Sequence, residues 1–285
     1  MKTIICPTDF STCADNAAIY AAELAREFDS RLILFHIYEN PLTFAEPSVV
    51  TTNEGLVSIM ELAWKNMIEL KYKLLAIDNN LKIETLIKDG SAPEQIIHIA
   101  VREVADAIVM GITGKSRLER VFMGSTTVKV IDQVACAVFI IPDEAQYQGI
   151  KKIVFATDLK SDNLNSATHI ATFAKHFNSE IIFVYVENKE HGQSDEIIDE
   201  MTRKIRKHMK YEKMSGYVAK STDVTEGISY FLEKNPADLV VMFSHQKHFP
   251  KTLFKPSVTK KMSAHILIPL LSLPLQSYTL AGAQL

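Results

Sequence analysis

Ile4-Ile5-Cys6-Pro7-Thr8-Asp9-Phe10 stands near the start of the chain, and 149 residues later stands Ile153-Val154-Phe155-Ala156-Thr157-Asp158-Leu159. The similarity continues without a gap, so that Asn16 corresponds to Asn165. Both stretches are short, apolar and bounded by an aspartate, as buried strands of a parallel sheet are. Similarity at a fixed offset is the signature of a repeated structural unit. The sequence therefore predicts two copies of one domain.

Later in the chain the offset is smaller. Residues 105–110 (ADAIVM) resemble residues 237–242 (ADLVVM), which is an offset of 132. The second copy has thus lost about 17 residues between its second and third strands. A chain of 285 residues fits two domains of usual size. We expect domains at residues 1–145 and 150–272, followed by a C-terminal tail at 273–285.

Within the first copy, apolar runs alternate with stretches of helical spacing. The expected strands are Ile4–Cys6, Leu32–Ile37, Ile83–Ile87, Ala107–Met110 and Ala137–Ile141. A second long helical stretch runs from about Leu56 to Leu75, and capping boxes at residues 91–94 (SAPE) and 223–226 (DVTE) each open a further helix. This alternation predicts an α/β fold with a parallel sheet, which binds ligands at the carboxyl ends of its strands.

Composition and charge exclude several classes of protein. Hydrophobic residues make up 47% and charged residues 23%, and no apolar run approaches the length of a membrane span. We therefore expect a cytoplasmic protein with no membrane partner. Residues 1–150 carry 13 Lys and Arg against 20 Asp and Glu, whereas residues 151–285 carry 18 against 14. The basic run at residues 203–210 repeats at helical spacing, so it is interpreted as a solvated helix face and no nucleic-acid partner is expected.

The loop after Met110 is the first candidate for a ligand site. It contains Gly111, Gly114 and Gly124, and the last of these precedes Ser125 at the start of a predicted helix. Glycines let the backbone approach a ligand, and a helix N-terminus favours an anion such as phosphate. Lys115 and Arg117 add positive charge. From physics alone, a plain surface loop with glycine turns remains an alternative.

The pattern Gly111-x2-Gly114-x9-Gly124-Ser125-Thr126 resembles the ATP-binding motif of the universal stress protein family. The stretches at residues 6–11 (CPTDFS) and 36–37 (HI) resemble the same family, and the resemblance covers both copies. It implies an adenine-nucleotide-binding α/β domain, with five parallel strands in the order 3-2-1-4-5, that binds ATP with or without Mg²⁺.

By this resemblance, Asp9 would lie beside the ribose, Pro7 and Ile37 would pack around adenine, and the glycine loop would hold the phosphates. The candidate binding residues are Pro7, Thr8, Asp9, Ile37, Met110, Gly111, Thr113, Gly114, Lys115, Ser116, Arg117, Gly124, Ser125, Thr126 and Thr127. Final strands of such domains pair across a two-fold axis, so residues 136–141 and 265–270 are expected to pair in an intramolecular pseudo-dimer; a homodimer is also allowed.

The second copy departs from this pattern. At the offset of 132, Gly111 becomes Phe243, Gly114 becomes Gln246 and Gly124 becomes Pro256. A phenylalanine is bulky where backbone must approach phosphate, and a proline has no N–H to donate. We expect this half to keep the fold and to have lost the nucleotide site.

Other candidate sites are weaker. His245 and His248 lack neighbouring ligands, so no metal is expected; Cys6 is expected to be buried, and Cys13, near the site, is a candidate for modification. No motif places a catalytic base. Three functions stay open: a stress or signalling protein in which bound ATP biases a conformation or a partner interface, a slow ATPase or autophosphorylating enzyme using hydroxyls such as Thr113, and a nucleotide-free interaction module.

Overall fold

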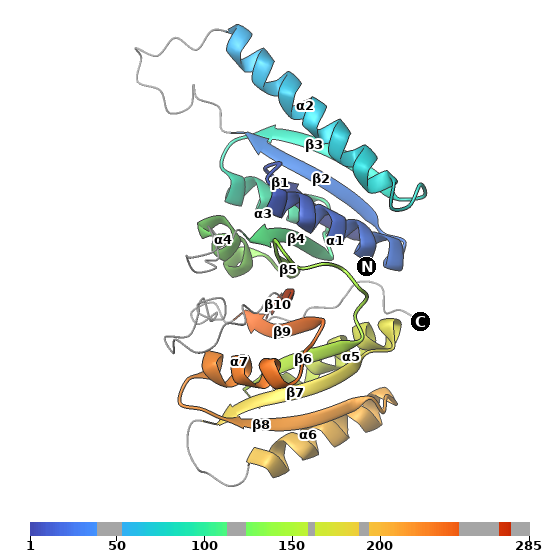
Figure 1. The fold of residues 1–285 in the computed structure, drawn as a ribbon, viewed down its shortest axis with the longest axis vertical. Helices are drawn as coiled ribbons and strands as arrows, with labels where there is room; N and C mark the ends of the chain where they lie inside the picture. Colours follow the sequence, from blue (N-terminus) through green and yellow to red (C-terminus); the bar gives the residue numbers. More distant parts are fainter. Residues whose placement is uncertain (39–52, 113–123, 159–162, 188–193, 245–267, 275–285) are drawn as a thin grey trace. The chain divides into compact units, whose positions relative to one another are not determined.

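The fold is described from a computed structural model that covers residues 1–38, 53–112, 124–158, 163–187, 194–244 and 268–274. The described residues form two compact units (Figure 1), one made of Met1–Ile112 with Gly124–Tyr147 and one that begins at Gln148. No helix in these ranges is both long enough and apolar enough to cross a membrane.

The first unit is a parallel sheet with helices between its strands. Its elements are β1 (Thr3–Thr8), α1 (Thr12–Phe28), β2 (Arg31–Tyr38), α2 (Asn53–Leu75), β3 (Lys82–Asp89), α3 (Ala92–Arg102), β4 (Ala107–Ile112), α4 (Ser125–Gln133) and β5 (Ala137–Pro142). The strand order is β3-β2-β1-β4-β5, and every pairing within it is parallel. The predicted fold class and strand order are therefore confirmed for this unit.

The second unit repeats the plan. Its elements are β6 (Lys152–Thr157), α5 (Asn163–Phe177), β7 (Glu180–Glu187), α6 (Ser194–Met209), β8 (Met214–Lys220), α7 (Val224–Lys234), β9 (Leu239–Ser244) and β10 (Leu270–Pro274). The strand order is β8-β7-β6-β9-β10. The two sequence offsets recur in the elements: β6 and β7 lie 149 residues after β1 and β2, while α7 and β9 lie 132 residues after α3 and β4.

The last strand begins five residues later than expected. We predicted it at residues 265–270, whereas β10 spans Leu270–Pro274 and runs past the expected domain end at residue 272. Pro269 explains where pairing starts, because proline cannot donate to a ladder and is tolerated just before a strand. Its carbonyl accepts the Val240 N–H at 2.9 Å, and Leu270 then pairs with Val240. The expected pairing of the two final strands with one another stays a prediction.

The two predicted capping boxes have different outcomes. Asp223 caps α7 through a bond from the Glu226 N–H at 2.9 Å, as expected. Ser91 is the N-cap residue of α3, but its hydroxyl accepts no capping bond. Pro93 occupies the first turn there and has no N–H to offer, so fewer amides need an acceptor.

A buried aspartate ties together the amino ends of β1 and β4. Asp106, 4% exposed, accepts the backbone N–H groups of Lys2 at 2.5 Å and Thr3 at 2.9 Å. In the second unit Asp238 accepts from Lys151 and Lys152, both at 2.8 Å. The same carboxylate therefore fixes the same strand pair in both units.

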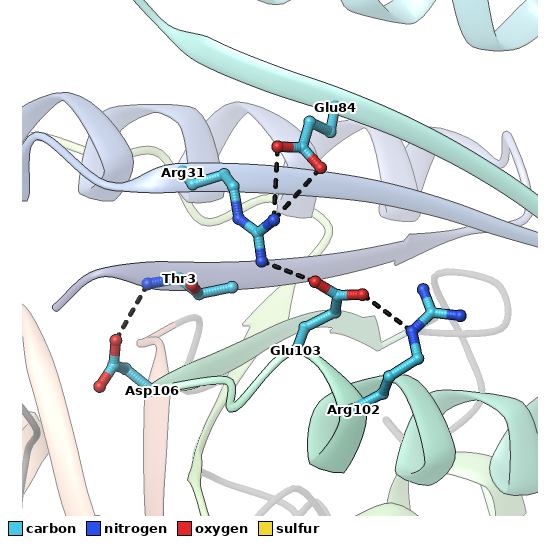
Figure 2. Close-up of polar contacts among 6 residues, drawn as sticks. All are labelled: Thr3, Arg31, Glu84, Arg102, Glu103 and Asp106. Carbon is cyan, nitrogen blue, oxygen red and sulfur yellow. Dashed lines mark hydrogen bonds and ion pairs between the residues drawn. The ribbon is translucent and has the colours of Figure 1, made fainter.

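Beside Asp106 lies an ion-pair cluster that belongs to the first unit. Figure 2 shows Arg31 between Glu84 and Glu103, with Arg102 on the other oxygen of Glu103. The Arg31 Nη2–Glu103 Oε2 distance is 2.7 Å, and this bond lowers the pKa of the Glu103 carboxyl below its ordinary value. At the equivalent positions the second unit has Glu180 for Arg31 and Asn235 for Glu103, so the pair is not repeated.

Candidate functional site

The carboxyl ends of β1, β2 and β4 lie at one edge of the first sheet. Thr8 is paired with His36 in the register of β1 and β2; Thr8 is the last buried residue of β1, and His36 is the first half-buried residue after the buried part of β2. Helices α1 and α4 begin at the same edge, because each follows a strand that ends there. The loops of the predicted site therefore meet at this edge, as they do in open parallel sheets generally.

The turn after β1 is held by its own side chains. Thr8 Oγ1 accepts the Phe10 N–H at 3.0 Å, and Asp9 Oδ1 accepts the Ser11 N–H at 3.0 Å. Ser11 Oγ in turn caps α1 by accepting the Ala14 N–H at 3.2 Å. Asp9 is exposed while Thr8 is buried. The Asp9 carboxylate is thus fixed at the surface through one oxygen, with Oδ2 outside the turn.

Phe10 and His36 support this turn from the neighbouring strand. Phe10 has φ +60°, a left-handed conformation that is uncommon for a bulky residue. Its ring lies 4.4 Å from the His36 ring, and His36 Nδ1 lies 2.8 Å from the Thr8 carbonyl oxygen. A carbonyl only accepts, so Nδ1 carries the proton. The sequence does not predict this role of Phe10 and His36, because the contact joins the ends of two strands that are separated in the chain by a helix.

Gly111 lies inside β4 and not in the loop where the sequence placed it. A Cβ built on Gly111 would lie 2.6 Å from Cys13 Sγ, 2.7 Å from the Cys13 carbonyl oxygen and 2.9 Å from its carbonyl carbon. The start of α1 therefore packs directly on the Gly111 backbone. This close approach is a structural reason for the glycine that is independent of any ligand.

Cys13 is correspondingly enclosed. It is 3% exposed, and burial raises the pKa of its thiol to about 12. A thiol with so high a pKa is protonated at neutral pH and a poor nucleophile. Cys6 and Cys136 are also buried, as expected for Cys6, and burial raises the pKa of each to about 12.

The N-terminus of α4 has no side-chain cap. Gly124 is its N-cap with φ −61° and ψ 153°, and a Cβ built on it would meet no atom of the described residues within 4 Å. The backbone N–H groups of Ser125, Thr126 and Thr127 occupy the first turn, where no intrahelical acceptor exists. The first turn of α4 contains no acidic residue. These amides and the helix dipole form a place where an anion is favoured.

The remaining candidate residues divide into three groups. Pro7, Thr8, Met110 and Thr127 are buried, Ile37 and Thr126 are half-buried, and Asp9, Gly124 and Ser125 are exposed. Residues outside the described ranges are Thr113, Gly114, Lys115, Ser116, Arg117, His245, Gln246, His248 and Pro256. The described residues thus bring the β1 turn together with the end of β2.

The equivalent edge of the second unit is filled. Phe243, which corresponds to Gly111, is 6% exposed, and its ring packs edge-on against Phe155 with centroids 5.2 Å apart. Phe155 corresponds to Cys6 and also contacts Phe183 at 5.5 Å. Two large rings therefore occupy the space where the first unit has a glycine and a cysteine. Among the described residues of the chain, no three His, Cys, Asp or Glu side chains cluster as metal ligands.

Both halves of the chain match the model of one protein family. The model of the Universal stress protein family matches residues 1–142 and again 149–274. Universal stress protein MJ0531 of Methanocaldococcus jannaschii is 31% identical over 150 residues, which are 49% of this chain and 81% of that protein.

One solved structure shares this fold over nearly the whole chain. A universal stress protein from Archaeoglobus fulgidus superposes with a TM-score of 0.75 at 14% identity, covering 96% of this chain and 98% of the other. At that identity the likeness concerns the fold alone. A universal stress protein in complex with cAMP is 21% identical, with a TM-score of 0.37, over 49% of this chain and 96% of the other.

Proposed function

The chain belongs to the universal stress protein family, and from that premise we propose that its first half binds ATP or a close adenine nucleotide at one site per chain. Nucleotide bound there would bias a conformation or a partner interface, as expected of a stress-response protein. The proposal assigns no catalytic residue.

The observation that carries the proposal is the N-terminus of α4, which begins at a glycine and has no side-chain cap. Its first-turn amides have no intrahelical acceptor, and no described atom lies within 4 Å of a Cβ built on Gly124. A phosphate is the anion that such a terminus suits, and the hydroxyls of Ser125 and Thr126 add donors. In the proposed complex, the glycine-rich segment between β4 and α4 covers the phosphates, with Mg²⁺ bound or absent.

The β1 turn supports the nucleoside end of the same ligand. Asp9 presents a fixed carboxylate at the surface, which can accept bonds from ribose hydroxyls. Pro7 and the half-buried Ile37 are the apolar neighbours for a base. Because the turn is already held by Thr8, Phe10 and Ser11, the carboxylate loses little conformational freedom on binding.

The second half contributes no site in this proposal. Phe243 and Phe155 fill its edge, and Pro256 stands where Gly124 starts α4 in the first half. The proposed stoichiometry is therefore one nucleotide per chain and not two.

The test is calorimetric titration of the full chain with ATP, ADP and cAMP, with and without Mg²⁺, after chromatography of any nucleotide released on denaturation. We expect saturable ATP binding at one site per chain. Gly114→Val adds a branched side chain in the phosphate loop and should weaken binding about a hundredfold, equivalent to two charge-assisted hydrogen bonds at roughly 1.5 kcal/mol each. Ser125→Ala should cost less, because it removes one hydroxyl.

Circular dichroism must show that both variants are folded. Equal affinities of wild type and Gly114→Val would overturn the assigned site. Absence of binding by wild type would favour the nucleotide-free module, and release of ADP or labelling of the protein from labelled ATP would favour the enzyme.

A further inference from the structure

Helix α2 has one buried apolar face and, among its described side chains, six large apolar ones that are exposed, including Ile59 at 42% and Leu62 at 59%. Ala63, Met67, Leu70 and Leu74 are 4% exposed or less and form the face packed in the first unit. A second row, which we call the α2 ridge, consists of Met60, Trp64, Ile68 and Tyr72. These four side chains are 40%, 41%, 49% and 69% exposed. Soluble proteins seldom leave a row of large apolar side chains in water without a binding role.

The ridge lies on the outer part of the first unit. Helix α2 contacts β2 and β3, and β3 is the edge strand of its sheet, as Figure 1 shows. Neither the β1 turn nor the start of α4 includes any ridge residue, so the ridge is not part of the proposed nucleotide site.

The corresponding helix of the second unit is different. On α6, Ile197 is the large apolar side chain that is exposed, at 47%, while Asp199, Glu200, Arg203, Lys204 and Lys207 are exposed charged residues. An exposed apolar row is therefore not a requirement of this helix in the repeated fold. Within the described residues, each chain has one such ridge.

We infer that the α2 ridge is the docking surface for a second copy of this chain. Its residues recur at every fourth position, which is the row that packs into the equivalent grooves of another helix. An antiparallel two-fold arrangement centred on Asn66 places Trp64 against Ile68 of the partner subunit. One self-complementary ridge per chain closes the assembly at two copies.

The balanced charge around the ridge favours a second copy of this helix over a strongly acidic or basic partner. Glu61, Lys65, Glu69 and Lys71 border the ridge, two acidic and two basic, with Lys65 and Glu69 joined as an ion pair at 3.9 Å. A strongly acidic or basic partner would find no complementary field there, whereas a second, equally balanced helix meets little net repulsion.

The exposed area sets the strength of the contact. With aromatic side chains at 150–250 Å², the exposed parts of the ridge amount to on the order of 400 Å². Standard interfaces bury about 800 Å² per partner, so this one corresponds to a weak, concentration-dependent dimer. We expect half-dissociation at roughly ten to a hundred micromolar.

Trp64 makes the test specific, because it is the sole tryptophan of the chain. Sedimentation velocity of the full, nucleotide-free chain should show mass rising from monomer toward dimer with concentration. The Trp64 emission maximum should shift to shorter wavelength over the same concentrations. Ile68→Glu, a good helix former at an exposed position, should weaken association at least tenfold and abolish the emission shift.

Ile197→Glu on α6 is the matched control, since it places the same charge at a similarly exposed isoleucine; it should leave association unchanged. A dimer that forms without a Trp64 shift, as pairing through final strands would produce, overturns the inference. So does a chain that stays monomeric at several hundred micromolar, or an Ile68→Glu variant that associates like wild type. None of these outcomes depends on nucleotide binding.

Discussion

Gly111 and Phe243 occupy the same place in the two halves, the fifth residue of β4 and of β9, and they show how one fold gives two different edges. In the first half, the backbone of Cys13 lies where any side chain at position 111 would stand. In the second half, the equivalent position holds a buried ring packed on Phe155. The strand order is the same in both, so what differs is whether this position admits the backbone of the first helix or holds a buried ring.

The comparison also distinguishes two structural roles of glycine. Gly111 is required by packing, whereas a Cβ on Gly124 would meet none of the described atoms within 4 Å. A sequence motif with both glycines therefore combines a scaffold position with a position that packing leaves free to serve the proposed site. Substitutions in the two halves can test this division.

The largest expected effect comes from exchanging the two residues. Gly111→Phe should destabilise the first half by about 3 kcal/mol or more, because its Cβ would overlap Cys13 backbone atoms that cannot move cheaply. Urea unfolding followed by Trp64 fluorescence reports this half alone, since the second half has no tryptophan.

Gly124→Ala is the control for that substitution. With φ −61° and open space around it, alanine should change stability by less than about 1 kcal/mol. Phe243→Gly should destabilise the second half by about 3–5 kcal/mol, measured by urea unfolding monitored by circular dichroism. It should not create an ATP site. Equal losses from Gly111→Phe and Gly124→Ala would contradict the packing role of Gly111.

The next largest effect on stability should distinguish Asp106 from Asp238, the two carboxylates that accept backbone N–H groups at the starts of the two sheets. Asp106→Ala leaves two backbone N–H groups without their acceptor in a buried place, and we expect a loss of about 2–4 kcal/mol. Asp238 is half-buried, so water can replace it, and Asp238→Ala should cost about half as much. Trp64 fluorescence follows unfolding of the first half, and circular dichroism follows both halves together. Equal losses of stability from Asp106→Ala and Asp238→Ala would show that burial does not control the strength of these bonds.

Asp9 and Asp158 provide a smaller, binding-level comparison. Asp9→Asn keeps an oxygen for the Ser11 N–H, so the turn is preserved, but it removes the charge that we propose to lie beside the ribose. ATP affinity should fall about tenfold, or 1.4 kcal/mol. Asp158→Asn, the equivalent change in the second half, should not alter calorimetric titration with ATP. An effect of Asp158→Asn similar to that of Asp9→Asn would indicate a second site.

The smallest effect concerns acid stability. Arg31 lowers the pKa of Glu103 in the folded state, so the pair stabilises at neutral pH, and this stabilisation is lost as pH falls below the ordinary value of 4.5 and through the folded pKa. Glu103→Gln should remove about 0.5–1 kcal/mol near pH 7, since both partners are partly exposed. Urea midpoints at pH 7 and pH 3.5 should differ less in the variant than in wild type, and an unchanged difference would argue against the pair.

The sequence predicted the sheet well because the same pattern of strands and helices occurs twice in the chain. The strand order of the first unit and the alternation of strands and helices were confirmed. The last strand was misplaced because two apolar runs, 266–268 and 270–273, flank Pro269, and composition does not choose between them. The offset of 132 applied to β5 would have given residues 269–274.

The site was less predictable, for a physical reason. The contacts of Gly111 with Cys13 and of His36 with Thr8 join segments far apart in the chain, and no local pattern records them. Asp9, by contrast, makes its turn with the residue two positions on, which the Pro-Thr-Asp-Phe-Ser stretch specifies locally. The nucleotide roles of these residues stay predictions.

The segment after β5 belongs to the first half more firmly than its position between two repeats suggests. Asn16 in α1 donates to the carbonyl oxygens of Pro142 at 2.9 Å and Ala145 at 2.8 Å, and Tyr147 packs edge-on against Tyr20 at 5.1 Å. Helix α1 is made early by the ribosome, yet these partners emerge only when the first half is almost fully synthesised. These contacts can therefore form only after residue 147 has been synthesised, and a fragment cut after Pro142 would lack the Ala145 acceptor of Asn16 and the Tyr147 ring on Tyr20.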